Sequence, residues 1–499
     1  MYKKQVVLNA IMSVAQIVVV GIVLFLLYRF LLNTIGPQQL GIWSLVVATT
    51  SLIQVANLGL FGSVVKYVAK YKAQGNFKKL SDVIQTAVIT VTILASLLLV
   101  IGYPLFKFVL EQVIPHEMLP VALSILPYAL VSMLLMMISG IFQSGLYGIQ
   151  RIDLSSYPLM GRVVVNLSLC FVLTPMYGLL GVAYAGVIQN LSTLLTSWLL
   201  LKNQLPILPI CLYRWNRNIF REIILYGKNL QAISIAEMLC DPITKFFLSK
   251  FGSLSMVGFY EMANKMVQQF REIIVSANRV VVPAIADMSE SAPEKIQAFY
   301  LRSYELLFYL ALPLFSLIIV CAPIISEIWI GYYEKVFVFS TILLSIGWFF
   351  TTLAVPAYFA NLGMGELRWN VISQILIAII NAAMGFFLGY YYGGSGVIVA
   401  WIIALPLGNC VIYIFYHIKH RIPFSELIPK SSRILMLTCI IATLSALIIK
   451  IKFDHIIITK ALNSLILIVF AAVIFIPFWF HPLRKSLIGW VYNAFQSRV

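Results

Sequence analysis

The sequence predicts an all-α integral membrane protein with fourteen transmembrane helices, and three observations support this. Of the 499 residues, 61% are hydrophobic and only 11% charged, with a mean hydropathy of +0.96, whereas soluble domains carry about 25% charged residues. Apolar runs of roughly 20 residues, enough to cross a bilayer core as a helix, recur along the whole chain. Lysine and arginine concentrate in alternate connections, as they do in multi-pass proteins.

The predicted spans are separated by short connections, and the longest polar one lies near 202–222. The first apolar run lacks a small-residue cleavage site and exceeds the length of a signal-peptide core, so we interpret it as a retained span. Helices are expected near 8–32, 38–62, 82–103, 118–148, 157–176, 178–201, 223–250, 253–287, 302–326, 337–361, 369–390, 394–417, 433–451 and 461–481.

The distribution of positive charge orients these spans, because cytoplasmic loops retain lysine and arginine. One alternating set of connections, which includes both termini, holds 22 of the 35 lysines and arginines, and the other set holds 8. Both termini are therefore expected in the cytoplasm. The formal net charge of +17 mostly reflects this bias and attraction to anionic lipid. It does not indicate nucleic-acid binding.

An internal repeat is visible at an offset of about 216 residues. "LGIWS" (40–44) matches "VGFYE" (257–261), "YGIQR" (147–151) lies opposite "MGELR" (364–368), and "GLLGVAYAG" (178–186) matches "GGSGVIVAW" (393–401). Six spans separate the copies, so both copies have the same orientation. The expected architecture is two pseudo-symmetric six-helix bundles with a cavity between them. We assign the first bundle to 1–205, a cytoplasmic linker to 206–222, the second bundle to 223–420, and two additional spans to 421–499.

Charged side chains form a stripe on the eighth predicted span. Each charge at the bilayer centre costs about 2.5–3.5 kcal/mol on insertion scales, so the stripe is expected to face a bundle interior or a wet cavity. Its members follow helical spacing: Glu261, Lys265, Gln268, Glu272, Ser276 and Arg279, with Arg271 beside them.

A similar stripe follows the seventh predicted span. Glu237 and Asp241 repel each other at i,i+4, so a proton or a bridging cation is expected there. The alternative is that Asp241 pairs with Lys245, and Glu261 with Lys265, as self-compensating structural pairs. The full stripe is Lys228, Gln231, Ser234, Glu237, Asp241 and Lys245.

The first bundle is predicted to have a polar but mostly neutral interior. Its first two spans have no carboxylate, and three cations lie near span ends: Arg29, Lys66 and Arg162. These cations either reach toward the membrane surface or line a site for an anionic head group. Neutral polar residues recur there at helical spacing: Asn9, Ser13, Gln16, Gln54 and Asn57.

Two stretches carry a family resemblance. "IGPQQLGIWSLVVATTSLIQVANLGLFGSVVKYVAKYKAQG" (35–75) and "DPITKFFLSKFGSLSMVGFYEMANKM" (241–266) resemble polysaccharide flippases of the Wzx type, of the multidrug/oligosaccharidyl-lipid/polysaccharide exporter superfamily. The resemblance implies a V-shaped transporter of the cytoplasmic (inner) membrane. Such a protein moves a polyprenyl-diphosphate-linked oligosaccharide to the outer leaflet for O-antigen, capsule or exopolysaccharide synthesis. One departure is Thr244, where the family usually has an acidic residue.

The resemblance and the stripes together suggest residue roles. Diphosphate or sugar is expected to contact Lys66, Lys245, Lys265, Arg271, Arg29 and Gln268. The coupling ion, Na⁺ or H⁺, is expected to bind Glu237, Asp241 and Glu261. No catalytic residue, metal or other cofactor is expected, and the six cysteines lack CxxC spacing. The expected partners are the lipid-linked glycan, membrane lipid and glycan polymerase or assembly proteins, with the chain itself a monomer.

Three rival functions remain. A peptidoglycan lipid II flippase would favour a fixed set of cavity arginines, whereas the basic positions here are mostly lysine. A multidrug or cation exporter of the same superfamily would need a carboxylate in the first-bundle cavity. An integral-membrane glycosyltransferase would need acidic motifs or a large loop on the outer face, and the first outer loop has no Asp or Glu.

Overall fold

The structure, a computed structural model, describes residues 2–210, 213–278, 281–453 and 460–484. Over these residues the chain forms fifteen α-helices, four short 3-10 helices (η) and no strand. Contacts divide the chain into two units. The first comprises Met1–Gly258 and Gly385–Val397, and the second Phe259–Met384 and Ile398–Val499.

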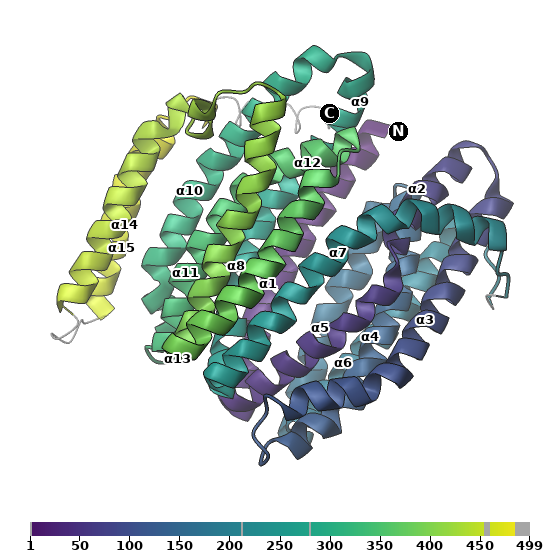
Figure 1. The fold of residues 1–499 in the computed structure, drawn as a ribbon, viewed down its shortest axis with the longest axis horizontal. Helices are drawn as coiled ribbons and strands as arrows, with labels where there is room; N and C mark the ends of the chain where they lie inside the picture. The colour runs from purple at the N-terminus through teal and green to yellow at the C-terminus, as the bar shows by residue number, and fades with distance from the viewer. Residues whose placement is uncertain (1, 211–212, 279–280, 454–459, 485–499) are drawn as a thin grey trace. The chain divides into compact units, whose positions relative to one another are not determined.

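The first unit holds the N-terminal helices (Figure 1). Within it, α6 packs against α4 and α5, α1 packs against α5, and α7 packs against α1, α2 and α3. The bounds are α1 Tyr2–Thr50, η1 Ser51–Asn57, α2 Leu60–Ala73, α3 Phe77–Glu111, α4 Leu119–Gly148, α5 Ile152–Tyr177, α6 Leu179–Gln204 and α7 Arg217–Phe251.

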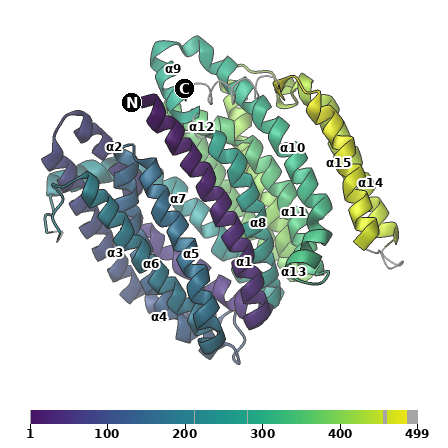
Figure 2. The ribbon, with the colours of Figure 1, turned by 180° about the vertical axis from the view of Figure 1, so that it is seen from behind.

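The second unit holds most of the remaining helices, of which α14 and α15 lie side by side and pack on α10 (Figure 2). Two helices cross the division between the units, since α8 begins in the first unit and the middle of α13 belongs to it. The bounds are α8 Leu254–Asn278, α9 Val281–Ser291, η2 Pro293–Lys295, α10 Ile296–Trp329, α11 Lys335–Leu353, α12 Val355–Met364, α13 Arg368–Lys419, η3 Phe424–Leu427, η4 Lys430–Ser432, α14 Arg433–Phe453 and α15 Lys460–Trp479.

Nine helical stretches in the described chain are long and apolar enough to cross a membrane. Two of them, Met12–Asn57 and Arg368–Lys419, have 46 and 52 residues, more than one crossing needs. Each bends at a glycine, Gly36 or Gly393, whose backbone leaves the helical region. The charged helices α7 and α8 are not among the nine. The total of fourteen crossings stays a prediction.

Large apolar side chains remain exposed along the helices. On α3, Val100 is 69% and Ile101 66% exposed, and on α14 and α15, Ile434 and Ile468 are 72% and 65% exposed. Exposed apolar side chains in such number are unfavourable in water and favourable against acyl chains. These faces are therefore suited to contact lipid.

Glycines at matching repeat positions make matching backbone contacts. A Cβ on Gly181 would lie 2.2 Å from the carbonyl oxygen of Leu173, and one on Gly396 would lie 2.0 Å from that of Leu388. The two contacts are 215 residues apart. In both, the absence of a side chain lets a helix fold back closely on the preceding one.

A second pair of glycine contacts is reciprocal. A Cβ on Gly41 would lie 1.8 Å from the carbonyl oxygen of Leu254, and one on Gly258 would lie 2.4 Å from that of Pro37. Gly41 and Pro37 correspond to Gly258 and Leu254 at an offset of 217. Both contacts join α1 to the start of α8, and all four residues belong to the first unit.

Three expected helices are divided in the structure. The expected helix 38–62 is wrong as a single element, because it passes from α1 into η1 and restarts as α2 after Leu58 and Gly59. The expected helix 337–361 is divided at Ala354 into α11 and α12. The expected helix 253–287 is described as α8 and α9, and the predicted stripe member Arg279 lies outside the described residues, between them.

The segment before α7 is held against α3 by hydrogen bonds. Gln85 Oε1 accepts from the backbone N–H groups of Tyr213 (3.3 Å) and Arg214 (3.2 Å). Two threonine hydroxyls of α3 accept from Trp215 and Asn216. Asn216 then caps α7 through its side-chain oxygen. The start of α7 is therefore fixed to the first unit.

A carboxylate also joins α7 to α2. Glu222 accepts hydrogen bonds from the Tyr71 hydroxyl (2.7 Å) and the Lys70 ammonium (3.0 Å). Partial burial alone would raise the pKa of Glu222, but these bonds outweigh it and lower the pKa below its usual 4.5. A lowered pKa stabilises the fold above about pH 4.5, and this stabilisation is lost as the pH falls through the folded-state value.

We expect Glu222→Gln to lower the free energy of unfolding at pH 7 by less than about 1 kcal/mol, because Lys70 and Glu222 are 45% and 31% exposed. Thermal unfolding of the purified protein between pH 7 and pH 3 measures the effect. The native chain should lose this increment on acidification and the variant should not. Equal pH slopes for the two proteins would contradict the assignment.

Candidate functional site

A break in the second predicted span shapes the candidate site. Leu58 and Gly59 both have left-handed backbone, with φ of 47° and 71°. Glycine adopts this conformation at little cost, whereas leucine there is strained. The sequence "NLGLFG" (57–62) supplies a glycine at one of the two positions. The break ends η1, and α2 begins at the next residue.

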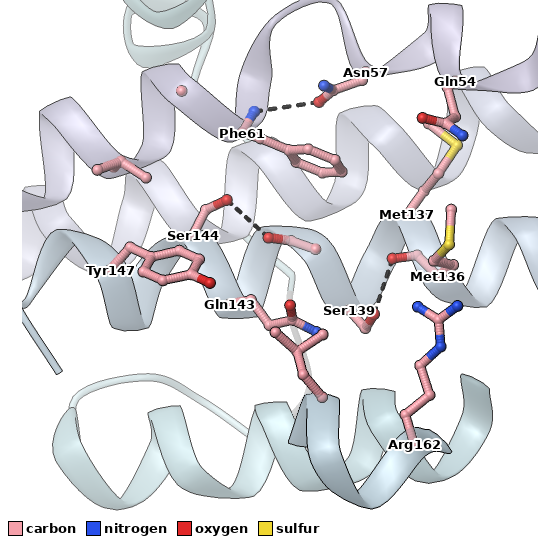
Figure 3. A pocket seen from close by; sticks show the side chains of 14 residues that line it. Gln54, Asn57, Phe61, Met136, Met137, Ser139, Gln143, Ser144, Tyr147 and Arg162 are labelled. Atoms are coloured by element: carbon pink, nitrogen blue, oxygen red, sulfur yellow. Dashed lines mark hydrogen bonds between the residues drawn. The ribbon is translucent and has the colours of Figure 1, made fainter. Parts of the chain in front are cut away.

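A cavity of about 400 Å³ lies beside this break, inside the first unit (Figure 3). Its walls come from η1 and α2, from α4, and from α5. The lining residues are Gln54, Asn57, Phe61, Gly62, Val65, Met136, Met137, Ser139, Gly140, Gln143, Ser144, Tyr147, Leu159 and Arg162.

The lining carries one positive charge. Arg162 extends from α5 toward Met136 and Ser139 of α4 (Figure 3). Neither an ion pair nor a hydrogen bond joins it to another residue that the structure describes. Among the lining residues none is Asp or Glu. A guanidinium facing a cavity without a carboxylate suits an anion, and phosphate above all, because its planar fork matches phosphate oxygens.

The rest of the lining is neutral and partly polar. Asn57 Oδ1 accepts from the backbone N–H of Phe61 (3.2 Å), which leaves its amide N–H groups to donate. Gln143, on α4, has no hydrogen-bond partner among the described residues. Phe61 and Tyr147 add aromatic rings. Amides bind hydroxyl groups and aromatic faces pack on apolar ones, so this lining suits a sugar.

All five predicted site residues of the first unit lie outside this lining, and three of them are exposed: Arg29, Lys66 and Glu237. Lys66 is exposed and its Nζ lies 3.7 Å from the centre of the Tyr226 ring, a cation–π contact with α7. Arg29 and Glu237 are exposed on α1 and α7. The structure does not bring these three together.

Asp241 and Lys245 form an ion pair with a Nζ–Oδ2 distance of 2.7 Å. The lysine is 3% exposed and the aspartate 44%. The observed contact is the structural pairing that the sequence left open as an alternative. It places a buried ammonium one turn from a half-exposed carboxylate, within the first unit. The side chain of Lys228, at the start of the same stripe, lies outside the described residues.

The other predicted site residues lie on α8, in the second unit: Glu261, Lys265, Gln268 and Arg271. Glu261 pairs with Lys265 at 3.7 Å, and Glu261 is the buried partner. The Arg271 guanidinium lies 4.9 Å from the Trp348 ring centre and 3.7 Å from Glu272.

Gln268 belongs to a small hydrogen-bonded group around Asn264. Asn264 Oδ1 accepts from Gln268 Nε2 and from the Trp348 indole, each at 3.2 Å. The structure therefore brings Gln268 and Arg271 together through Trp348 of α11. The sequence did not predict the contacts of Trp348, because this residue lies on another helix, far from Gln268 and Arg271 in the chain.

The cavity residues on α4 were also not predicted from the sequence. Ser139, Gln143 and Tyr147 recur at intervals of four residues on an apolar helix, so they share one face. That spacing is a readable polar stripe and could have indicated the cavity. Gln54, Asn57 and Arg162, by contrast, were singled out from the sequence, and the structure places all three in the lining.

We expect a double-mutant cycle at Asp241 and Lys245 to show that this ion pair contributes to stability. Asp241→Asn removes a carboxylate from the buried Lys245. Breaking a fully buried pair typically costs about 3–5 kcal/mol, and the half-exposed aspartate should place the effect below that range. Adding Lys245→Gln should recover part of the stability lost in Asp241→Asn. Thermal unfolding of both variants and the double variant measures this. Purely additive losses would contradict the pairing.

Comparisons with known proteins identify the family and the fold of the chain. Residues 6–289 match a family model described as polysaccharide biosynthesis protein. A Shigella flexneri protein named "Putative O-antigen transporter" is 20% identical over 395 residues, which cover 78% of this chain and 92% of that protein. An inward-facing multidrug resistance transporter of the MATE family and MOP superfamily has a TM-score of 0.71 at 17% identity, covering 85% and 99% of the chains. The lipid II flippase MurJ, in an inward closed conformation, has a TM-score of 0.72 at 13% identity; the match covers 96% of this chain and 99% of MurJ.

Proposed function

Because the chain belongs to the polysaccharide biosynthesis protein family, as residues 35–75 and 241–266 predicted, we propose that it is a flippase for a polyprenyl-diphosphate-linked oligosaccharide. The glycan would pass from the inner to the outer leaflet of the cytoplasmic membrane for cell-surface polysaccharide synthesis. The structural relatives share the MOP-transporter fold, and the curated relative is named as a transporter. No catalytic step is needed.

The observation that carries the proposal is the composition of the first-unit cavity. It combines one guanidinium that no described residue pairs with, three amide side chains, and hydroxyl and aromatic groups, without an acidic residue in its lining. The guanidinium would bind the diphosphate, and the amides and aromatic rings would contact the first sugar. On the predicted topology Arg162 lies near the inner end of its span, where a substrate made in the cytoplasm would enter.

A drug or cation exporter fits this cavity poorly. A cationic substrate placed beside Arg162 would meet a like charge with no carboxylate in the lining to offset it. A lipid II flippase would also carry a diphosphate and sugars, so the cavity chemistry is shared and the substrate must be identified by experiment.

Transport is proposed to proceed by alternating access, with binding first on the inner side and release on the outer side. Glu237, Asp241 and Glu261 are the proposed ion-coupling carboxylates, and Lys66, Lys245, Lys265, Arg271, Arg29 and Gln268 the proposed further contacts of the glycan. Two of these carboxylates already pair with lysines. A proton or Na⁺ arriving at either pair would have to compete with an ammonium.

The test is identification of the lipid-linked glycan that accumulates on deletion of the gene. We expect a polyprenyl-diphosphate oligosaccharide to accumulate on the cytoplasmic face and surface glycan to disappear, with recovery on complementation. Extracted lipids analysed by mass spectrometry identify the head group. An accumulated lipid II would support the alternative, and unchanged lipid pools with normal surface glycan would overturn the proposal. Lys265→Ala and Glu237→Gln, tested in the same strain, check the two proposed residue roles.

A further inference from the structure

The second predicted span is broken at Leu58 and Gly59, and two of its faces make contacts: one lines the cavity and the other packs on α7. One face lines the cavity: Gln54 and Asn57 from η1, and Phe61 and Val65 from α2. Phe61 and Val65 are one helical turn apart, so they share a side of α2. We call residues 51–63, from the start of η1 through the first turn of α2, the span 2 joint.

The other face of the span 2 joint contacts α7. Gln231 Nε2 donates to the carbonyl oxygen of Val55 (3.1 Å), and the Ser63 hydroxyl donates to that of Ile223 (2.8 Å). Between them, Gly59 meets Gly227. A Cβ on Gly59 would lie 2.2 Å from the carbonyl oxygen of Gly227. Two glycines facing each other allow the backbones to touch.

The contact with α7 lies where the backbone of the span 2 joint departs from helical geometry. The Val55 carbonyl accepts from Leu58 N–H (3.2 Å) as well as from Gln231. Leu58 and Gly59 then take left-handed backbone conformations. Non-glycine residues held there depend on their surroundings. On this geometry α7 supports the strained turn that separates η1 from α2.

We propose that α7 sets the shape of the cavity through the span 2 joint, with Gly227 and Gln231 as positioning residues for Gln54 and Asn57. Neither Gly227 nor Gln231 lines the cavity. The geometric coupling stands on its own, and its role in substrate binding rests on the proposed function. The chain leaves the first unit soon after α7, at Phe259. Any displacement of α7 during transport would therefore alter the affinity of the cavity, and ligand binding would in turn restrain α7.

The decisive variants are Gln231→Leu and Gly227→Ala. Leucine removes the bond to Val55 and also removes Gln231 Oε1, a buried oxygen without a hydrogen-bond partner among the described residues, so the fold should be retained. Alanine at 227 brings a Cβ within 2.5 Å of the Leu58 carbonyl oxygen. Leu225→Ala, at a 53% exposed position on α7, is the control for the first variant. Gly161→Ala, with nothing within 4 Å, is the control for the second.

Hydrogen-exchange mass spectrometry of the full-length protein in detergent gives the first measurement. Gln231→Leu and Gly227→Ala should speed amide exchange in residues 51–63, and the two controls should not. Binding of farnesyl diphosphate, a soluble prenyl diphosphate, gives the second. Its dissociation constant should rise about fivefold in both variants, because α7 would no longer hold Gln54 and Asn57 in place.

The outcomes separate the two proposals. Unchanged exchange in 51–63 in both variants would overturn the coupling, whatever the probe does. Faster exchange with an unchanged dissociation constant would overturn control of the cavity by α7. If the native protein does not bind the probe, the diphosphate assignment of the proposed function fails, and the exchange data alone still decide whether α7 supports the joint.

Discussion

Replacing Arg162 with alanine is expected to reduce transport of the proposed substrate, a lipid-linked oligosaccharide, by about tenfold or more, with the protein still present in the membrane. Arg162 is the one cation among the described residues that line the cavity. A hydrogen bond to a charged group contributes about 1.5–3 kcal/mol, which corresponds to roughly 10- to 150-fold in affinity. Surface glycan display in a complemented deletion strain measures the loss.

Two further variants make the Arg162 result specific. Arg162→Lys keeps the charge but loses the planar fork, so it should retain part of the activity. Arg302→Ala removes an exposed arginine at the start of α10, outside the cavity, and should transport normally. Full transport by Arg162→Ala at native expression would mean that the cavity does not hold the diphosphate.

Replacing Gly41 with alanine is expected to destabilise the protein by about 3 kcal/mol, near the upper end for overpacking. A Cβ there would lie 1.8 Å from the carbonyl oxygen of Leu254, so the two backbones must separate. The reciprocal contact of Gly258 with Pro37 would be strained by the same movement. Thermal unfolding of the purified variant, with detection of monodisperse protein, measures the loss.

The matched control is Gly161→Ala on α5, where a Cβ meets nothing within 4 Å. Alanine favours helix over glycine by about 1 kcal/mol, so this variant should be as stable as the native protein or slightly more so. Similar melting temperatures for Gly41→Ala and Gly161→Ala would show that the close contact at Gly41 does not contribute to stability.

Several features of this protein followed from the sequence because they are local. Runs of about 20 apolar residues specify membrane helices wherever they occur. Polar residues at helical spacing identified Gln54 and Asn57, and the scarcity of charge in the first bundle drew attention to Arg162. The family resemblance at residues 35–75 was confirmed by the match over 6–289. All three kinds of signal are carried by neighbouring residues in one segment.

The sequence could not show which of these residues share a site. Arg162 meets Gln54 and Asn57 only because α5, α4 and the broken second span converge, and the predicted cations Lys66 and Lys265 instead face Tyr226 and Glu261. The left-handed turn at Leu58 was also unpredicted, since leucine prefers a continued helix. Contacts with Gly227 and Gln231 hold it.

The sequence by itself therefore determined the all-helical, apolar character of the chain and its family, because hydrophobic runs and short motifs are properties of single segments. The tertiary structure alone decided the cavity, its single guanidinium and the contact of the second span with α7. A side chain's partners depend on the packing of helices far apart in the chain, and the free energy that keeps a strained turn comes from those partners.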